Sequence, residues 1–325
     1  MRDSDELIRF KCSEGSNEIM KSKIVRVCLS SGRCVIYHIS RSQSSMKHLS
    51  FYLAVLFCVA VTSAILLDPL ASRGQSKNGG QPGADTAKRN ALLSNSLTWT
   101  FGGKQQHGWY LYTPLIKQTI GTKHDSDTVQ FARAVARWQA KSALKPSGVI
   151  DEEALYAMIK TWQDARLKDR TVAAPDQLLT APLSDFYDPT RAEELRQVER
   201  RTYAAYKRMV AAAVADPSLG LAHQRGELAS GEKYLKIISA FRSPQYQEKL
   251  RREAPNSGSA GLAVNSPHFT GRALDLYVGG EPVDTRDSNR ALQVQTRVYQ
   301  WLVRNAERFG FRPYCYEPWH WEYVR

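Results

Sequence analysis

Two histidines near the end of the chain stand close to carboxylates in a pattern that suggests metal chemistry. The first, His268, precedes Asp275 in the segment SPHFTGRALD. A strand that starts near Gly271 would place Asp275 in a run of residues otherwise suited to burial. A buried carboxylate needs a cation or several hydrogen-bond donors. His268 and Asp275 are therefore candidate ligands of one metal ion.

The second histidine, His320, lies in the segment EPWHWE between Glu317 and Glu322. Two histidines and one aspartate leave a zinc ion one open coordination position for a water molecule. Zinc lowers the pKa of that water, and a nearby carboxylate can accept its proton. We assign this role to Glu317 and keep Glu322 as a partner that orients a ligand. Either motif alone also suits a structural histidine, but the two together favour metal-assisted hydrolysis.

A third element with chemical potential is Arg242, at the end of the apolar segment YLKIISAF. A guanidinium there can reach into a cleft, where its fork suits a carboxylate or a developing oxyanion. The alternative is an arginine that pairs with a local acid at the strand end.

The elements that must position these residues indicate an α+β fold, with a small mixed or antiparallel sheet and flanking helices that carry the zinc site. We expect a helix over 193–215, strands over 234–241 and 271–278, and a helix that starts at Asp287 or Ser288 and stops at Gly310. A small helical domain and an N-terminal membrane segment precede this part.

Helical spacing upstream predicts one helix near residues 129–139 and a second that begins at Asp151 or a neighbour. The preceding aromatic segment, 97–120, is read as short strands. The pattern resembles the peptidoglycan-binding module found beside many wall-lytic enzymes, on the residues Phe131, Val135, Trp138, Gln139, Leu144, Gly148, Ile150, Asp151 and Leu155. The alternative is a helical hairpin packed on the next domain.

The stretch from Leu49 to Leu67 has no charged residue and is long enough to nearly span a bilayer of about 30 Å. Basic residues precede it, so the rule that positive flanks stay inside predicts that everything after Asp68 is exported. Residues 49–67 are therefore a signal peptide or membrane anchor. Residues 1–48 are expected to be a cytoplasmic segment or an N-terminal extension, and in the second case residues 1–45 would precede a true start at Met46. Linkers are expected at 68–96 and 166–190, around a 97–165 module and a 191–325 catalytic domain.

Charge and cysteine content exclude some classes of protein. The net charge of +13 is spread nearly evenly along the 325 residues, whereas a nucleic-acid reader concentrates it on one element, so no nucleic-acid partner is expected. Four of the five cysteines precede residue 60, and no Cys-x-x-Cys pair occurs. A thiolate zinc knuckle or a thioredoxin-like redox site is therefore excluded.

Taken in order, the motifs of the C-terminal part resemble the VanY-type D-alanyl-D-alanine carboxypeptidases, zinc peptidases of the bacterial cell wall. The resemblance runs from about Tyr203 to Arg325 through SAFRSPQYQ, SPHFTGRALD, WLVRNAERFGF and EPWHWE. It implies one zinc ion per chain, bound by His268, Asp275 and His320, and Glu317 as the general base. The Gly/Ser-rich loop over 254–267 departs from the family pattern.

The resemblance also implies roles around the substrate. Arg242 would stabilise the oxyanion or grip the substrate, and Ser266, Gln247 and Trp319 are the further substrate-binding candidates. The expected reaction is removal of the terminal D-Ala from peptidoglycan stem peptides by an exported protein, in contact with the cell-wall polymer and anchored to the membrane through residues 49–67. Two alternatives are an endopeptidase that cuts peptide cross-links and a non-catalytic wall-binding protein.

Overall fold

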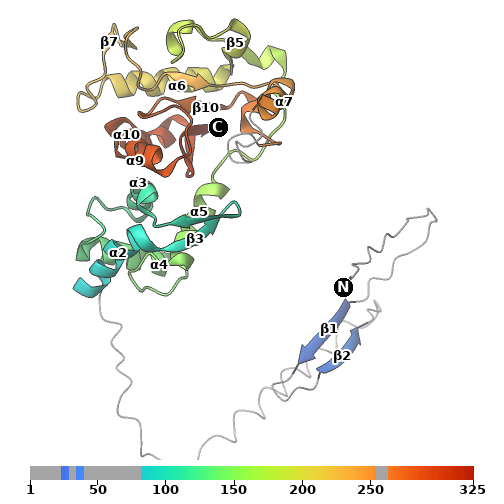
Figure 1. Ribbon diagram of the computed structural model, residues 1–325, viewed down its shortest axis with the longest axis vertical. Coiled ribbons are helices and arrows are strands. Elements are labelled where there is room, and N and C mark those ends of the chain that lie inside the picture. The colour runs from blue at the N-terminus through green and yellow to red at the C-terminus, as the bar shows by residue number, and fades with distance from the viewer. Residues whose placement is uncertain (1–22, 29–33, 40–81, 254–262) are drawn as a thin grey trace, which may run out of the picture. The chain divides into compact units, whose positions relative to one another are not determined.

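The structure, a computed structural model, describes residues 23–28, 34–39, 82–253 and 263–325 (Figure 1). The chain divides into two compact units, Met1–Lys77 and Asn78–Arg325. In the first unit, β1 (Lys23–Cys28) and β2 (Cys34–Ile39) form an antiparallel pair. The predicted membrane segment at 49–67 lies outside the described residues. Within the described ranges, no helix has the length and hydropathy needed to cross a bilayer.

The second unit begins with a group of helices and one hairpin. These elements are α2 (Ala84–Ser96), β3 (Thr98–Phe101), β4 (Lys104–His107), the 3-10 helix η1 (Tyr110–Tyr112), α3 (Thr113–Ile120), α4 (Val129–Lys141) and α5 (Glu152–Asp164). The two predicted helices are present as α4 and α5. Thr128 caps the first, and Asp151 caps the second by accepting a hydrogen bond from the backbone N–H of Ala154 at 3.0 Å.

Two parts of this region differ from the sequence prediction. Residues 84–96 were expected to be a linker, but they form the helix α2. The polar side chain of Asn90 on this helix is buried, where it makes hydrogen bonds to backbone groups of the turn at 148–150. Asn90 donates to the carbonyl of Gly148 at 2.8 Å and accepts from the N–H of Ile150 at 2.9 Å. In the 97–120 segment only the first half forms strands, β3 and β4, while the second half forms the helices η1 and α3.

The C-terminal part contains a four-stranded antiparallel sheet in the order β11-β12-β10-β9. Its strands are β9 (Ile237–Ser239), β10 (Ala273–Leu276), β11 (Phe311–Tyr314) and β12 (Glu317–Tyr323). The helix α6 (Arg200–Val214) runs along the sheet, and α9 (Asp287–Gln295) and α10 (Arg297–Asn305) lie on the side facing the helices of the preceding part (Figure 1). The helix α7 (Pro244–Glu253) follows β9.

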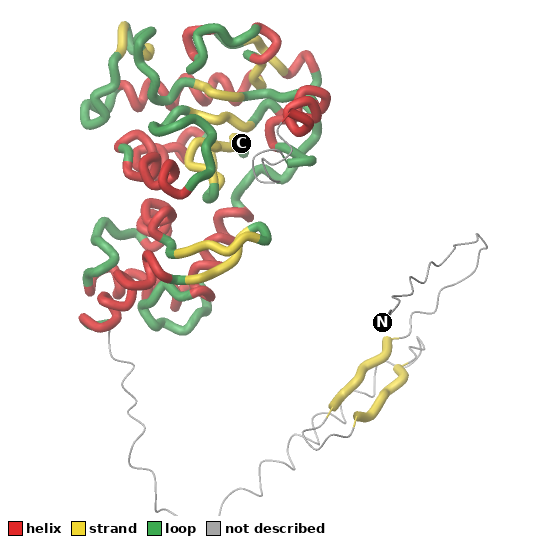
Figure 2. The backbone as a smooth tube through the Cα atoms, in the orientation of Figure 1, coloured by secondary structure: helices red, strands yellow, loops and turns green. Residues whose placement is uncertain are grey.

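Shorter pieces complete this part. They are η2 (Pro175–Gln177), β5 (Leu178–Thr180), η3 (Leu183–Asp185), η4 (Glu193–Leu195), β6 (Gln197–Glu199), β7 (His223–Gln224), β8 (Glu227–Leu228), η5 (Pro267–Thr270) and η6 (Ala306–Phe309). Short strands lie among helices and loops (Figure 2), so the predicted α+β class is confirmed.

Several predicted boundaries shift for local reasons. The helix expected from 193 begins at Arg200, because the side chain of Glu199 accepts hydrogen bonds from the first free N–H groups of the helix. Residues 178–180 of the expected 166–190 linker form β5, which pairs with β6. The last helix is divided at Thr296, which caps α10. The helix α10 ends at Asn305 and the chain continues as the 3-10 helix η6, which stops before Gly310, the predicted end, with φ of 92°.

The aromatic segment 97–120 packs against the C-terminal part of the same unit. The ring of Phe101 stacks on Tyr316 with centroids 5.4 Å apart. The buried guanidinium of Arg290 lies 4.1 Å from the ring centroid of Tyr316 and donates to the hydroxyl of Tyr112 at 3.0 Å. These contacts give the aromatic residues a structural role.

Candidate metal centre

Three buried side chains from separate elements meet in the C-terminal part. One donor atom each from His268, Asp275 and His320 lies within 4.8 Å of the others. The Nε2 atom of His268 is 3.3 Å from Oδ2 of Asp275, and Nδ1 of His320 is 2.9 Å from Oδ1. The fold thus brings together the three residues that the sequence predicted as ligands.

His268 is held by the short helix η5, which precedes β10. The hydroxyl of Ser266 accepts a hydrogen bond from the backbone N–H of His268 at 3.3 Å, and Nδ1 of the ring lies 2.6 Å from the carbonyl of Ala240. The chain then turns at Gly271, which has φ of 65° and where a Cβ would lie 2.9 Å from the backbone of Glu199. The ring is thereby oriented with Nε2 toward Asp275.

His320 and Asp275 are direct cross-strand neighbours, since β10 and β12 pair Asp275 with His320. The other ring nitrogen of His320, Nε2, lies 3.2 Å from Oε1 of the fully buried Glu322. Each histidine therefore has one nitrogen fixed by an acceptor and the other directed at the carboxylate, the arrangement that orients metal-binding imidazoles. Glu322 occupies the position of an orienting partner.

The electrostatics of the three residues fit a bound cation. Burial, followed by the charge of Arg242, lowers the pKa of His268 to about 4, so its ring is neutral and able to donate a lone pair. Burial alone would raise the pKa of Asp275, but the two imidazoles hold it below its usual range. Burial also disfavours a charged His320, yet hydrogen bonds to Asp275 and Glu322 raise its pKa to about 9.

The two imidazoles, at 3.3 Å and 2.9 Å, thus keep the buried carboxylate of Asp275 charged, and a positive charge beside it is favourable. A divalent ion bound by the two imidazoles and the carboxylate would supply this positive charge in place of a proton on His320. Nε2 of His268 makes no hydrogen bond among the described residues although it is buried, and it is thus available as a ligand. The donor set, two nitrogens and a carboxylate oxygen, is one that suits zinc.

Glu317 stands beside this cluster because β12 is irregular at its start. In a regular strand, residues three apart point to opposite faces. The register between β11 and β12 shifts after Pro313, which pairs with Trp321, so that Tyr314 pairs with Glu317. Glu317 and His320 thereby line the same cavity. Burial raises the pKa of Glu317 to about 7, and its buried Oε1 has no hydrogen-bond partner among the described residues.

Arg242 follows β9 and is also buried at the cluster. Its Nη2 lies 3.4 Å from Oδ2 of Asp275, and its Nη1 donates to Oε1 of Gln247 at 3.0 Å. The amide nitrogen of Gln247 in turn donates to the carbonyl of Ala263 at 3.0 Å. Gln247 therefore contacts Arg242 and the loop before η5, and it is not part of the cavity wall.

The cavity at the cluster has a volume of about 190 Å³. Trp319, proposed from the sequence as a substrate-binding residue, is buried in the hydrophobic core and does not line it. The wall also holds residues that sequence reasoning missed, and those with a charged or aromatic side chain are Arg166, Arg170 and Tyr314. Both arginines belong to the polar stretch 166–190, which the sequence analysis interprets as a linker. The only feature of the sequence that indicates a role for them at the cavity is their positive charge.

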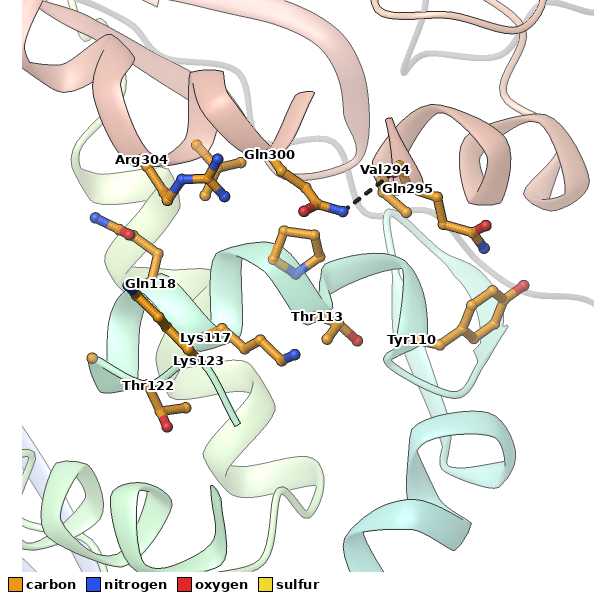
Figure 3. A pocket seen from close by; sticks show the side chains of 13 residues that line it. Tyr110, Thr113, Lys117, Gln118, Thr122, Lys123, Val294, Gln295, Gln300 and Arg304 are labelled. Carbon is orange, nitrogen blue, oxygen red and sulfur yellow. Dashed lines mark hydrogen bonds between the residues drawn. The ribbon is translucent and has the colours of Figure 1, made fainter. Parts of the chain in front are cut away.

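A larger cavity, of about 680 Å³, lies between α3 and α10. Lys117 and Gln118 face it from α3, and Gln300 and Arg304 face it from α10 (Figure 3). It contains neither Glu317 nor any of the three clustered ligands, so the chemistry locates the candidate site in the smaller cavity.

Comparison with known families agrees with this location. Residues 196–325 match the family described as VanY, D-alanyl-D-alanine carboxypeptidase. A search of curated proteins found no match. Because the family match starts at residue 196, the resemblance of residues 97–165 to a peptidoglycan-binding module stays a prediction. The match to the VanY family of D-alanyl-D-alanine carboxypeptidases covers less than half of the chain, residues 196–325, and it confirms the resemblance seen in the sequence motifs of that part.

Proposed function

We propose that this protein is a zinc-dependent D,D-carboxypeptidase that removes the terminal D-Ala from peptidoglycan stem peptides. The observation that carries the proposal is the convergence of His268, Asp275 and His320 next to Glu317, inside the segment that matches the family. The presence of all four residues in one buried place disfavours a non-catalytic wall-binding protein.

When bound to the three ligands, zinc would supply a Lewis acid and a water of lowered pKa. Glu317 accepts the proton of the attacking water and returns it to the leaving amine, since it is the carboxylate beside the ligands that is not itself engaged by a histidine. Arg242 places a positive charge next to the cluster, where it stabilises the developing oxyanion. Ala240 and Glu322 hold the two imidazoles in orientation.

The size of the cavity supports an exopeptidase. Pockets for drug-sized ligands have volumes of about 300–1,000 Å³, whereas this cavity has about 190 Å³. A small cavity suits the last residue of a peptide better than a chain that continues on both sides of the cleaved bond. Incubation with purified muropeptides followed by mass spectrometry separates the two reactions, because loss of one alanine and loss of a cross-link give different masses.

We further propose that the enzyme works outside the cytoplasmic membrane, as a membrane-anchored or periplasmic protein. The support is the uncharged segment 49–67 with its basic upstream flank. The substrate proposed for the active site is found in the same compartment.

The direct test is release of D-Ala from a pentapeptide ending in D-Ala-D-Ala. We expect release by the full chain, a loss of at least about a hundredfold after chelation, and recovery on addition of zinc. Metal analysis of the purified protein should find about one zinc ion per chain. Release that is unaffected by a chelator, in protein shown to be free of metal, would contradict the proposal.

The rate should fall on the acid side as Glu317 becomes protonated. A protonated carboxyl cannot accept a proton, and the pKa of Glu317 is about 7 before a cation binds beside it. A nearby cation favours the carboxylate form. The acid limb of kcat/KM should therefore have its midpoint at or below about pH 7. A pH profile in which kcat/KM rises from pH 7 to pH 5 would exclude Glu317 as the base.

A further inference from the structure

The stretch that follows α5 contributes to the active-site cavity although it lies outside the family match. It leaves α5 and runs on into the C-terminal part (Figure 1). The backbone N–H of Leu167 donates to Oε2 of Glu322 at 2.9 Å, and the N–H of Ala173 donates to the carbonyl of Phe269 at 2.8 Å. These bonds fix the stretch against β12 and η5, so Arg166 and Arg170 are held at the cavity by backbone contacts.

Arg166 is fully occupied within the protein. Its Nε donates to Oε1 of Glu322 at 3.2 Å, and its Nη1 donates to Gln163 at 2.7 Å. Its guanidinium also lies 4.0 Å from the ring centroid of Tyr314. Arg166 is thus a positioning residue that holds Glu322, which in turn holds His320.

Arg170 is different, because the carboxylate that it pairs with, Glu322, is shared with Arg166 and His320. Its side chain is 20% exposed, and its Nη1 is buried with no hydrogen bond among the described residues. The nearest carboxylate oxygen, Oε1 of Glu322, is 3.6 Å away and already accepts from Arg166 and contacts His320. The Nη1 atom of Arg170 is buried at the cavity with no hydrogen bond among the described residues, so an anion bound in the cavity could accept one from it.

The balance of charges around the cavity also favours the binding of an anion. The other arginines of the wall, Arg166 and Arg242, face the carboxylates Glu322 and Asp275. Together with Arg170 and the proposed general base Glu317, the cavity has three guanidinium groups and three carboxylates around it. A bound divalent cation then leaves the cavity with an excess of positive charge, which favours an anionic ligand.

The peptide that the proposed function assigns to this cavity ends in a carboxylate one residue beyond the cleaved bond. We propose that Arg170 recognises this C-terminal carboxylate and so restricts the enzyme to chain ends. This inference rests on the proposed function and deepens it, since it names the residue that would distinguish a carboxypeptidase from an endopeptidase. A guanidinium fork matches a carboxylate with two hydrogen bonds.

The test compares two ligands, a pentapeptide ending in D-Ala-D-Ala with a free carboxylate and the same peptide as its C-terminal amide. Their affinities are measured by calorimetry on the full, zinc-loaded chain carrying Glu317→Gln, which prevents turnover. With Arg170 present, the acid should bind at least about tenfold more tightly than the amide. Adding Arg170→Gln should reduce this ratio to near one, and Arg170→Lys should restore part of it.

Lys168→Gln is the matched control, because it removes a positive charge from the same stretch. The Lys168 side chain is 67% exposed and does not line the cavity. It should leave the acid-to-amide ratio unchanged. A ratio that survives Arg170→Gln, in a protein whose wild type releases D-Ala, would overturn the assignment of Arg170 alone. Absence of D-Ala release by the wild-type chain would overturn the proposed function itself.

Discussion

Replacing Glu317 with Gln is expected to lower kcat for D-Ala release by about a thousandfold or more while zinc stays bound at about one ion per chain. The amide has the shape of the carboxylate but cannot accept a proton. The substitution should not unfold the protein, since Oε1 of Glu317 has no hydrogen-bond partner to lose among the described residues. Single-turnover kinetics, metal analysis and thermal unfolding on the same preparation measure the three quantities.

Glu322→Gln is the informative comparison, because Glu322 is also a buried glutamate next to His320. Its carboxylate holds the ring of His320 and pairs with Arg166, so this variant should lose zinc affinity by about 10-fold to 100-fold. The two glutamates thus separate proton transfer from ligand orientation. Activity retained in Glu317→Gln and lost in Glu322→Gln with zinc still bound would move the general base to Glu322.

Replacing His268 with Ala is expected to lower zinc affinity by more than about a hundredfold, a larger effect than the loss of an orienting partner. Wild-type protein saturated with zinc should unfold at a higher temperature than after chelation, because a ligand that binds only the folded state stabilises it. In His268→Ala this difference should become much smaller, because the stabilisation falls with the logarithm of the zinc affinity. Differential scanning calorimetry with and without chelator measures it, and it separates metal binding from the packing lost with the buried ring.

The matched control is His223→Ala, since His223 is an exposed histidine of the same part of the chain. It should keep both zinc content and the effect of the chelator on unfolding. If His268→Ala kept a full metal-dependent stabilisation, the three clustered residues would not be the zinc site.

The candidate ligands could be found from the sequence because their surroundings follow local rules. Alternation along a strand predicts that Asp275 is buried, and a buried carboxylate needs a cation. The same alternation could not predict that Glu317 lies at the same cavity as the candidate metal ligands. That depends on the irregular pairing of β11 with β12, a property of two strands together.

The sequence predicts the surroundings of a polar side chain less well than those of an apolar one. The composition of residues 84–96 suggested a linker, but Asn90 is polar because it satisfies the backbone of a buried turn at Gly148 and Ile150. Trp319 stood in a chemical motif and nevertheless packs in the core. A polar side chain can form hydrogen bonds with water, with the backbone of a buried turn or with a substrate. Only the residues that lie near it in the folded structure show which of these partners it has.

Residue types and their local order, by themselves, determined the α+β class, the resemblance of the C-terminal part to the VanY family and the set of candidate metal ligands. The tertiary structure decided which other side chains share the cavity, above all Arg166 and Arg170, which come from outside the family match. The physical reason is that strand and helix periodicity reports the burial of a residue, whereas pairing between charges depends on contacts between segments far apart along the chain. Arg166 and Glu322 are such a pair.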